Sequence, residues 1–126
     1  METDDVDEAA AALREAAEEV GLDAATAGVE IVGRLERIVV AASGFMLDPF
    51  VAVAARRPLL RPDPAEVSAI LTPPLSAFLP DAPIVTREET IRGARIRYGG
   101  YAVDGGIVWG ATARILGQLG AVVGRP

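Results

Sequence analysis

The chain has 126 residues, 51% of them hydrophobic, and carries 12 basic against 18 acidic side chains, a formal net charge of −6. Its length suits one domain, and its hydrophobic content excludes disorder throughout. All basic residues are arginines, and histidine and cysteine are absent. These absences exclude Ser-His-Asp and Cys-His catalysis, zinc-finger sites and disulfides. A metal site would need oxygen ligands, which favours magnesium, manganese or calcium.

The charge is unevenly distributed along the chain. Residues 1–30 hold ten acidic side chains and one arginine, a net charge of −9, whereas residues 31–126 have a net charge of +3. An acidic beginning argues against nucleic-acid binding there and does not resemble a signal peptide, so we expect a cytoplasmic protein. Residues 38–55 are nearly all apolar, but Asp48-Pro49 interrupts them. Two buried strands therefore fit this stretch better than a membrane span.

The first predicted element is a helix over residues 5–20. Asp5 and Glu8 form a capping-box pattern at its start, and Gly21 is placed to end it in the left-handed conformation. A thin apolar stripe follows helical spacing. Its members are Val6, Ala9, Leu13, Ala16, Ala17 and Val20.

The central part of the chain is predicted to contain strands and short elements. Strands are expected at residues 29–32, 37–42 and 45–55, with Phe45 and Phe50 packing inside. A loop containing Pro58, Pro62 and Pro64 follows. Residues 66–71 fit either a strand or a short helical piece, and residues 74–79 a short helix.

The last part is predicted to form a hairpin and a closing helix. Strands at residues 90–96 and 98–103 would turn at Gly99-Gly100, and the helix would occupy residues 109–119, with Trp109 on its packed side. The order of elements indicates a mixed α/β domain.

Three carboxylates share one face of the first helix. Glu15, Glu18 and Glu19 stand at positions i, i+3 and i+4, within about one turn. Like charges at this spacing cost roughly 0.2–0.5 kcal/mol per pair, and a divalent cation would reverse that sign. Arg14 is adjacent in sequence and suited to brace one carboxylate. On charge alone, a solvated acidic face is the commoner interpretation.

This stretch resembles the second half of the Nudix box, the signature motif of the Nudix hydrolase family. That half reads Arg-Glu-U-x-Glu-Glu-x-Gly-U, where U is an aliphatic residue. The chain matches it at Arg14, Glu15, Ala16, Glu18, Glu19, Gly21 and Leu22. Val6 stands where the first glutamate of the box is expected, and Asp5, one residue earlier, is similar to the aspartate that CoA-type members often carry.

Three later segments resemble the CoA pyrophosphatase-like branch of this family. Residues 43–51 are similar to its Thr-Gly-aromatic and Thr-Pro-aliphatic strand, and residues 63–69 to its Asn-Pro-x-Glu-Val segment. Residues 107–116 closely resemble its C-terminal Ile-Trp-Gly-Ala-Thr-Ala-Arg-Ile-Leu helix. The resemblance implies a single partial Nudix domain over residues 1–126, an α/β/α sandwich with a mixed sheet whose N-terminal strands are missing.

The resemblance implies hydrolysis of the pyrophosphate bond of CoA or acyl-CoA, giving 3′,5′-ADP and (acyl-)4′-phosphopantetheine, with Mg²⁺ or Mn²⁺ as cofactor. Glu15, Glu18 and Glu19 would be metal ligands, or Glu15 would position the attacking water, and Arg14 would orient Glu15. Glu66 is our candidate for a further catalytic carboxylate, although a solvated loop glutamate is an equally good interpretation. Glu88-Glu89 is a weaker candidate for that role.

Further candidates would contact the ends of such a substrate. Arg56, Arg57 and Arg61 suit the 3′-phosphate of CoA, although solvation is the commoner role of such a loop. Trp109 and Tyr101 suit stacking on a base, although a lone tryptophan is more often a core anchor.

The family's first strands, its Gly-Gly loop and a CoA-type signature do not precede the helix here. We therefore expect catalysis by this chain to be impaired. Two explanations of the missing segments compete: a start codon assigned too late, or a non-catalytic remnant that binds a partner or a metal. A Nudix hydrolase for ADP-ribose or dinucleotides is a third possibility. Uncovered apolar surface would favour pairing of two copies into a homodimer.

Overall fold

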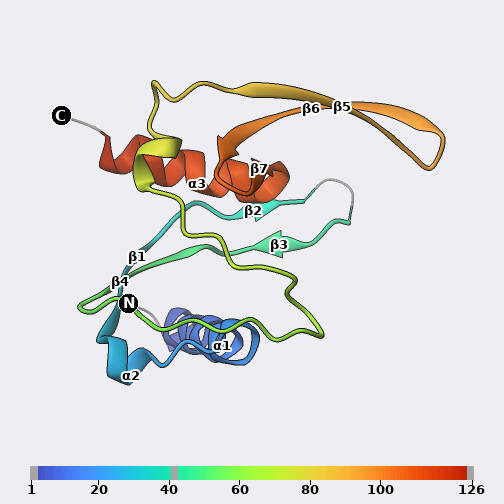
Figure 1. Ribbon diagram of the computed structural model, residues 1–126. Coiled ribbons are helices and arrows are strands. Elements are labelled where there is room, and N and C mark those ends of the chain that lie inside the picture. Colours follow the sequence, from blue (N-terminus) through green and yellow to red (C-terminus); the bar gives the residue numbers. More distant parts are fainter. Residues whose placement is uncertain (1–2, 41–42, 125–126) are drawn as a thin grey trace. The chain divides into compact units, whose positions relative to one another are not determined.

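The computed structural model describes residues 3–40 and 43–124, which form two compact units (Figure 1). Unit 1 consists of Met1–Glu36 and Asp48–Ile70, and unit 2 of Arg37–Leu47 and Leu71–Pro126. Both contain helical turns and strands, and every strand pair in the described part is antiparallel. The predicted α/β class is thus confirmed, while the single domain and its layering stay predictions. Across the described residues, we find no helix with both the length and the apolar character that a membrane crossing needs.

Unit 1 begins with the long helix α1, Thr3–Val20. It starts two residues earlier than predicted, and the side chains of Asp5 and Val6 lie outside the described part. Gly21 ends the helix as expected, with φ 69° and its N–H donating to the carbonyl oxygen of Ala17 at 3.1 Å. Ala9, on the predicted apolar stripe, is only 5% exposed.

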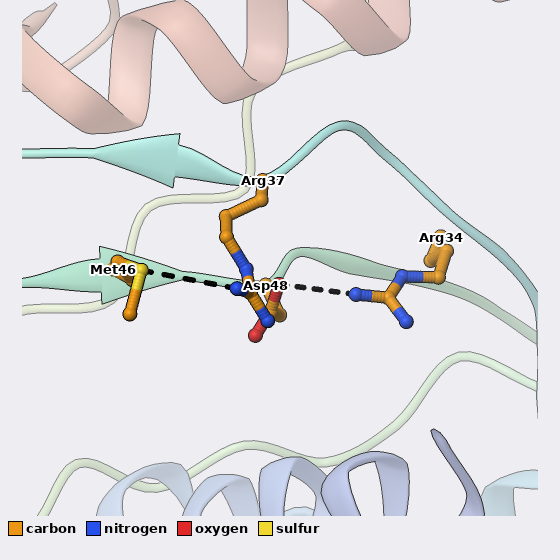
Figure 2. Close-up of polar contacts among 4 residues, drawn as sticks. All are labelled: Arg34, Arg37, Met46 and Asp48. Atoms are coloured by element: carbon orange, nitrogen blue, oxygen red, sulfur yellow. Dashed lines mark hydrogen bonds and ion pairs between the residues drawn. The ribbon is translucent and has the colours of Figure 1, made fainter. Parts of the chain in front are cut away.

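A single helical turn, α2 (Ala24–Ala27), leads into the paired strands β1, Val29–Arg34, and β4, Phe50–Ala54. The predicted strand over residues 45–55 is broken at Asp48-Pro49, because a proline cannot donate to a strand ladder. Asp48 instead pairs with Arg34 at 3.0 Å, as Figure 2 shows. The Arg34 guanidinium also lies 5.5 Å from the ring centroid of Phe50.

Unit 2 contains the short hairpin of β2, Ile38–Val39, and β3, Met46–Leu47. Arg37 donates from Nη1 to the sulfur of Met46 at 3.8 Å (Figure 2). The end of the predicted strand 37–42, Ala41-Ala42, lies outside the described part. The prediction that Phe45 packs inside is wrong, because this residue sits at the hairpin tip and is 71% exposed.

The larger sheet of unit 2 contains β5 (Val85–Ile91), β6 (Ala94–Val103) and β7 (Gly106–Trp109) in that order. The predicted turn at Gly99-Gly100 is wrong: the chain turns at Arg92-Gly93, where φ is 51° and 78°. Gly100 lies within β6 opposite Trp109, where a Cβ would overlap the Val108 carbonyl oxygen. Close packing of the neighbouring strand, and not a turn, therefore requires this glycine.

The 3₁₀ helix η1, Leu75–Phe78, confirms the short helix predicted after Pro74, and α3, Gly110–Val123, closes the chain. Phe78 is 3% exposed, and Gly120 of α3 lies against its backbone. Trp109 ends β7 and is the N-cap residue of α3, so the helix begins one residue later than predicted, at Gly110, where φ is 66°. Residues 66–71 form neither strand nor helix, contrary to prediction.

Candidate functional site

Residues 14–20 of the matched half of the Nudix box lie in the C-terminal half of α1 in unit 1, and Gly21 and Leu22 follow the helix. Arg14, Glu15, Glu18 and Glu19 are all exposed, whereas Leu13, Ala16 and Val20 on the other side are half-buried. The last turn of the helix contains no basic residue. Carboxylates near the negative end of a helix dipole are unfavourable, and so is their mutual repulsion. A bound cation would relieve both effects.

The chain returns to this end of the helix after β4. Arg61 donates its backbone N–H to the carbonyl oxygen of Val20, and Asp63 donates to that of Glu19, both at 2.8 Å. These bonds satisfy carbonyl groups that a helix end leaves without intrahelical partners. Segment 61–63 is thereby attached to the part of α1 that carries the glutamates.

Glu66 stands in the turn that follows this attachment. The Asp63 carboxylate accepts from the backbone N–H of Ala65 at 3.0 Å, and the Asp63 carbonyl oxygen accepts from those of Glu66 and Val67 at 3.0 and 2.8 Å. This local turn replaces the strand or helix predicted at residues 66–71. It leaves the Glu66 side chain exposed in the same unit as α1.

The oxygen donors suit Mg²⁺ or Mn²⁺, but they do not close into a cage by themselves. Among residues 7–40 and 43–124, no three or more acidic side chains converge closely enough to hold an ion. The weaker candidates in β5 of unit 2 have partners: Glu88 pairs with Arg95 at 3.1 Å, and Glu89 accepts from the Tyr98 hydroxyl at 2.7 Å. The metal site on α1 therefore stays a prediction.

Two of the three predicted phosphate-binding arginines line one pocket of unit 1. Its volume is about 340 Å³, and its walls come from α2 and from the chain after β4. The lining residues are Asp23, Thr26, Ala27, Arg56, Arg57, Pro58 and Leu59. Arg61 does not line this pocket. Asp23 is not among the site residues expected from the sequence. The Asp-x-x-Thr spacing from Asp23 to Thr26 is nevertheless typical of a helix cap and indicates that Asp23 lies at the start of a helix.

Asp23 is held in place by the residues that it caps. Its carboxylate accepts from the Thr26 backbone N–H at 3.0 Å and from the Thr26 hydroxyl at 2.9 Å. The backbone hydrogen bond, followed by the hydroxyl one, holds the pKa of the Asp23 carboxyl below its ordinary value of 3.8. Asp23 is therefore negatively charged at neutral pH.

The two aromatic residues predicted to stack on a base have different neighbours in unit 2. Tyr101 packs edge-on against Phe78, with ring centroids 5.2 Å apart. Trp109 packs on Tyr98 at 4.7 Å and is 50% exposed. Stacking of Trp109 or Tyr101 on a base therefore stays a prediction.

Curated relatives of the chain include two Nudix hydrolases. The chain is 33% identical over 110 residues to the uncharacterized Nudix hydrolase NudL of Photorhabdus laumondii, a match that covers 87% of this chain and 57% of that protein. It is 34% identical over 130 residues to Nudix hydrolase 22, chloroplastic, of Arabidopsis thaliana, a match that covers 97% of this chain and 41% of that protein. The chain spans about half the length of the curated relatives it matches.

No family model matches the chain, and no solved structure matches it significantly. The assignment therefore depends on curated relatives such as these two and on the box residues of α1. Both relatives are Nudix hydrolases, and their similarity over most of this chain, about 33% identity, supports its membership of the Nudix hydrolase family.

Proposed function

We propose that this protein is a metal-dependent hydrolase of the pyrophosphate bond of CoA or acyl-CoA, with 3′,5′-ADP and (acyl-)4′-phosphopantetheine as products. The observation that carries the proposal is the exposed Arg14-Glu15 and Glu18-Glu19 face at the end of α1, which matches the second half of the Nudix box. CoA is favoured among Nudix substrates by the resemblance of residues 107–116 to the C-terminal helix of the CoA-type branch.

In this proposal Glu15, Glu18 and Glu19 hold Mg²⁺ or Mn²⁺. When bound, such an ion neutralises pyrophosphate charge and lowers the pKa of a coordinated water. Arg14 orients Glu15 through a charge-assisted hydrogen bond. Glu66 supplies a further carboxylate from the turn attached to the helix end. The hydrogen bond from Asp63 N–H to the Glu19 carbonyl oxygen supports this role, because it attaches the turn to the box.

The test is ³¹P NMR of CoA incubated with the purified chain and Mg²⁺ or Mn²⁺. We expect slow replacement of the pyrophosphate signals by phosphomonoester signals, and we expect Glu18→Gln to abolish this change. Asp7→Asn is the matched control, since it also neutralises an exposed acid of α1 but lies outside the matched half of the box. Equal loss of activity in both variants would mean that helix charge matters and the box does not.

Two alternatives predict different outcomes of the same experiment. Cleavage of ADP-ribose or a dinucleotide in preference to CoA would assign the protein to another Nudix substrate class. Absence of cleavage with every substrate would favour a non-catalytic module that binds a partner or a metal. A cytoplasmic location and pairing into a homodimer belong to the proposal as well, and size-exclusion chromatography with light scattering tests the second.

A further inference from the structure

The pocket of unit 1 has the features of a site for an anion attached to an organic group. Arg56 and Arg57 place two positive charges in its wall, against one negative charge from Asp23. Beside them stands Leu59, which is 94% exposed and so offers an apolar surface next to the charges. Ligand pockets combine an apolar lining with a few placed polar groups in this way.

Arg56 is fixed before any ligand arrives. Its backbone N–H donates to the carbonyl oxygen of Ala27 at 3.0 Å, and its side-chain Nε donates to that of Thr26 at 2.7 Å. Its Nη2 lies 3.2 Å from the position that a Cβ on Gly28 would occupy. A guanidinium has four N–H groups besides Nε–H, and these form the fork that matches phosphate oxygens. Little side-chain freedom is lost when such a fork binds.

The Asp23 carboxylate is the one feature of the pocket that opposes an anion. Both of its oxygens accept hydrogen bonds from Thr26, so the carboxylate serves the start of α2. Its negative charge nevertheless weakens the attraction of the two arginines. Replacing Asp23 by asparagine would remove the charge and keep a good cap, because asparagine and aspartate cap helices about equally well.

We propose that this pocket binds a phosphomonoester group of a nucleotide, with Arg56 and Arg57 on the phosphate and Leu59 against the organic part. The inference rests on the proposed function, in which the bound group is the 3′-phosphate of CoA. Segment 55–63 connects the two sites: it joins α2 through Ala55 and Arg56, and the end of α1 through Arg61 and Asp63. The pocket with Arg56 and Arg57 thus lies on the chain segment that is attached to α1, the helix with the three glutamates.

The test is calorimetric titration of the purified chain, without divalent metal, with 3′,5′-ADP, 5′-AMP and inorganic phosphate. We expect 3′,5′-ADP to bind most tightly of the three. Arg57→Ala should weaken its binding about 10-fold or more, which is the scale of a lost hydrogen bond to a charged group. Asp23→Asn should tighten it by about two-fold or more. Arg61→Ala removes the same charge from the same segment outside the pocket and should leave the Kd unchanged.

Unchanged binding in both Arg57→Ala and Asp23→Asn would overturn the inference, and so would an equal loss in Arg61→Ala. Equal affinity for 5′-AMP and 3′,5′-ADP would overturn the assignment of the 3′-phosphate to this pocket. The titration involves no turnover, so the two proposals fail separately. A chain that binds 3′,5′-ADP as expected but leaves CoA intact contradicts only the proposed function. A chain that cleaves CoA with the same KM in Arg57→Ala contradicts only the pocket.

Discussion

Replacing Gly120 by alanine tests how α3 packs on η1. A Cβ at this position would overlap the carbonyl oxygen of Phe78, with the Phe78 carbonyl carbon at 2.6 Å and the Leu79 nitrogen at 3.2 Å, where ordinary contacts begin at 3.4 Å. Overpacking costs about 1–3 kcal/mol, and we take the upper end because backbone atoms cannot rotate away. Alanine recovers about 1 kcal/mol of helix propensity. The expected net loss of unfolding free energy is about 2 kcal/mol.

The assay is urea unfolding followed by the fluorescence of Trp109, the one tryptophan of the chain, which lies in the same unit. A lower midpoint at unchanged slope would report lost stability. Ala121→Gly is the control: this neighbour in α3 is exposed, so it should lose only about 1 kcal/mol of propensity. A Gly120→Ala variant more stable than the parent would refute close packing of α3 on η1.

Three further predictions concern stability and titration. Gly100→Ala should lower the urea midpoint because its Cβ would overlap a β7 carbonyl, whereas Gly106→Ala, with open space at its Cβ, should stay within about 0.5 kcal/mol of the parent. Because hydrogen bonds at the start of α2 lower the pKa of Asp23, its contribution to stability should be present above pH 3.8 and be lost as the pH falls through the lowered value. Other carboxylates also contribute to the loss of stability in acid, so an acid limb of unchanged size in Asp23→Asn would contradict this. The hydrogen bond to Glu89 raises the pKa of Tyr98 above 10.0, so ultraviolet titration should show its phenol ionising at a higher pH than an ordinary tyrosine, and Glu89→Gln should lower this pKa again. The linked contribution to stability should be present below pH 10.0 and be lost as the pH rises through the raised value.

Local signals predicted the long helices α1 and α3 but missed the single turn of α2. Alanine and glutamate at helical spacing before Gly21 specified α1, because propensity, apolar stripe and terminator all agree there. The same local reasoning failed at the hairpin of β5 and β6. Gly99-Gly100 is the more conspicuous turn signal, but Gly93 with Arg92 makes the turn. Gly100 lies inside a strand because β7 pairs with β6 at this position. The few residues next to Gly100 in the sequence do not show this pairing.

Of the two candidate sites, the glutamates of α1 could be predicted from local sequence and the arginine pocket could not. The glutamates of α1 share a face because helical geometry alone decides it, so the spacing was sufficient. The arginine pocket brings together residues 23–27 and 56–59, which depends on the register of β1 against β4 and on the bond from Arg56 to Thr26. A sequence shows the arginines but not which of them meet Asp23. For this reason the sequence alone does not separate Arg61 from the other two arginines.

The pairing of β2 with β3 is nested in sequence inside the pairing of β1 with β4. Closing a short loop costs less chain entropy than closing a long one, so pairing of β2 with β3 has the smaller entropy cost and should form first. We expect β1 to remain without its ladder during synthesis until β4 has left the ribosome. Each unit is also built from two separate stretches of chain, so neither can be obtained by simple truncation. Dissection of this protein would therefore require circular permutation or internal linkers.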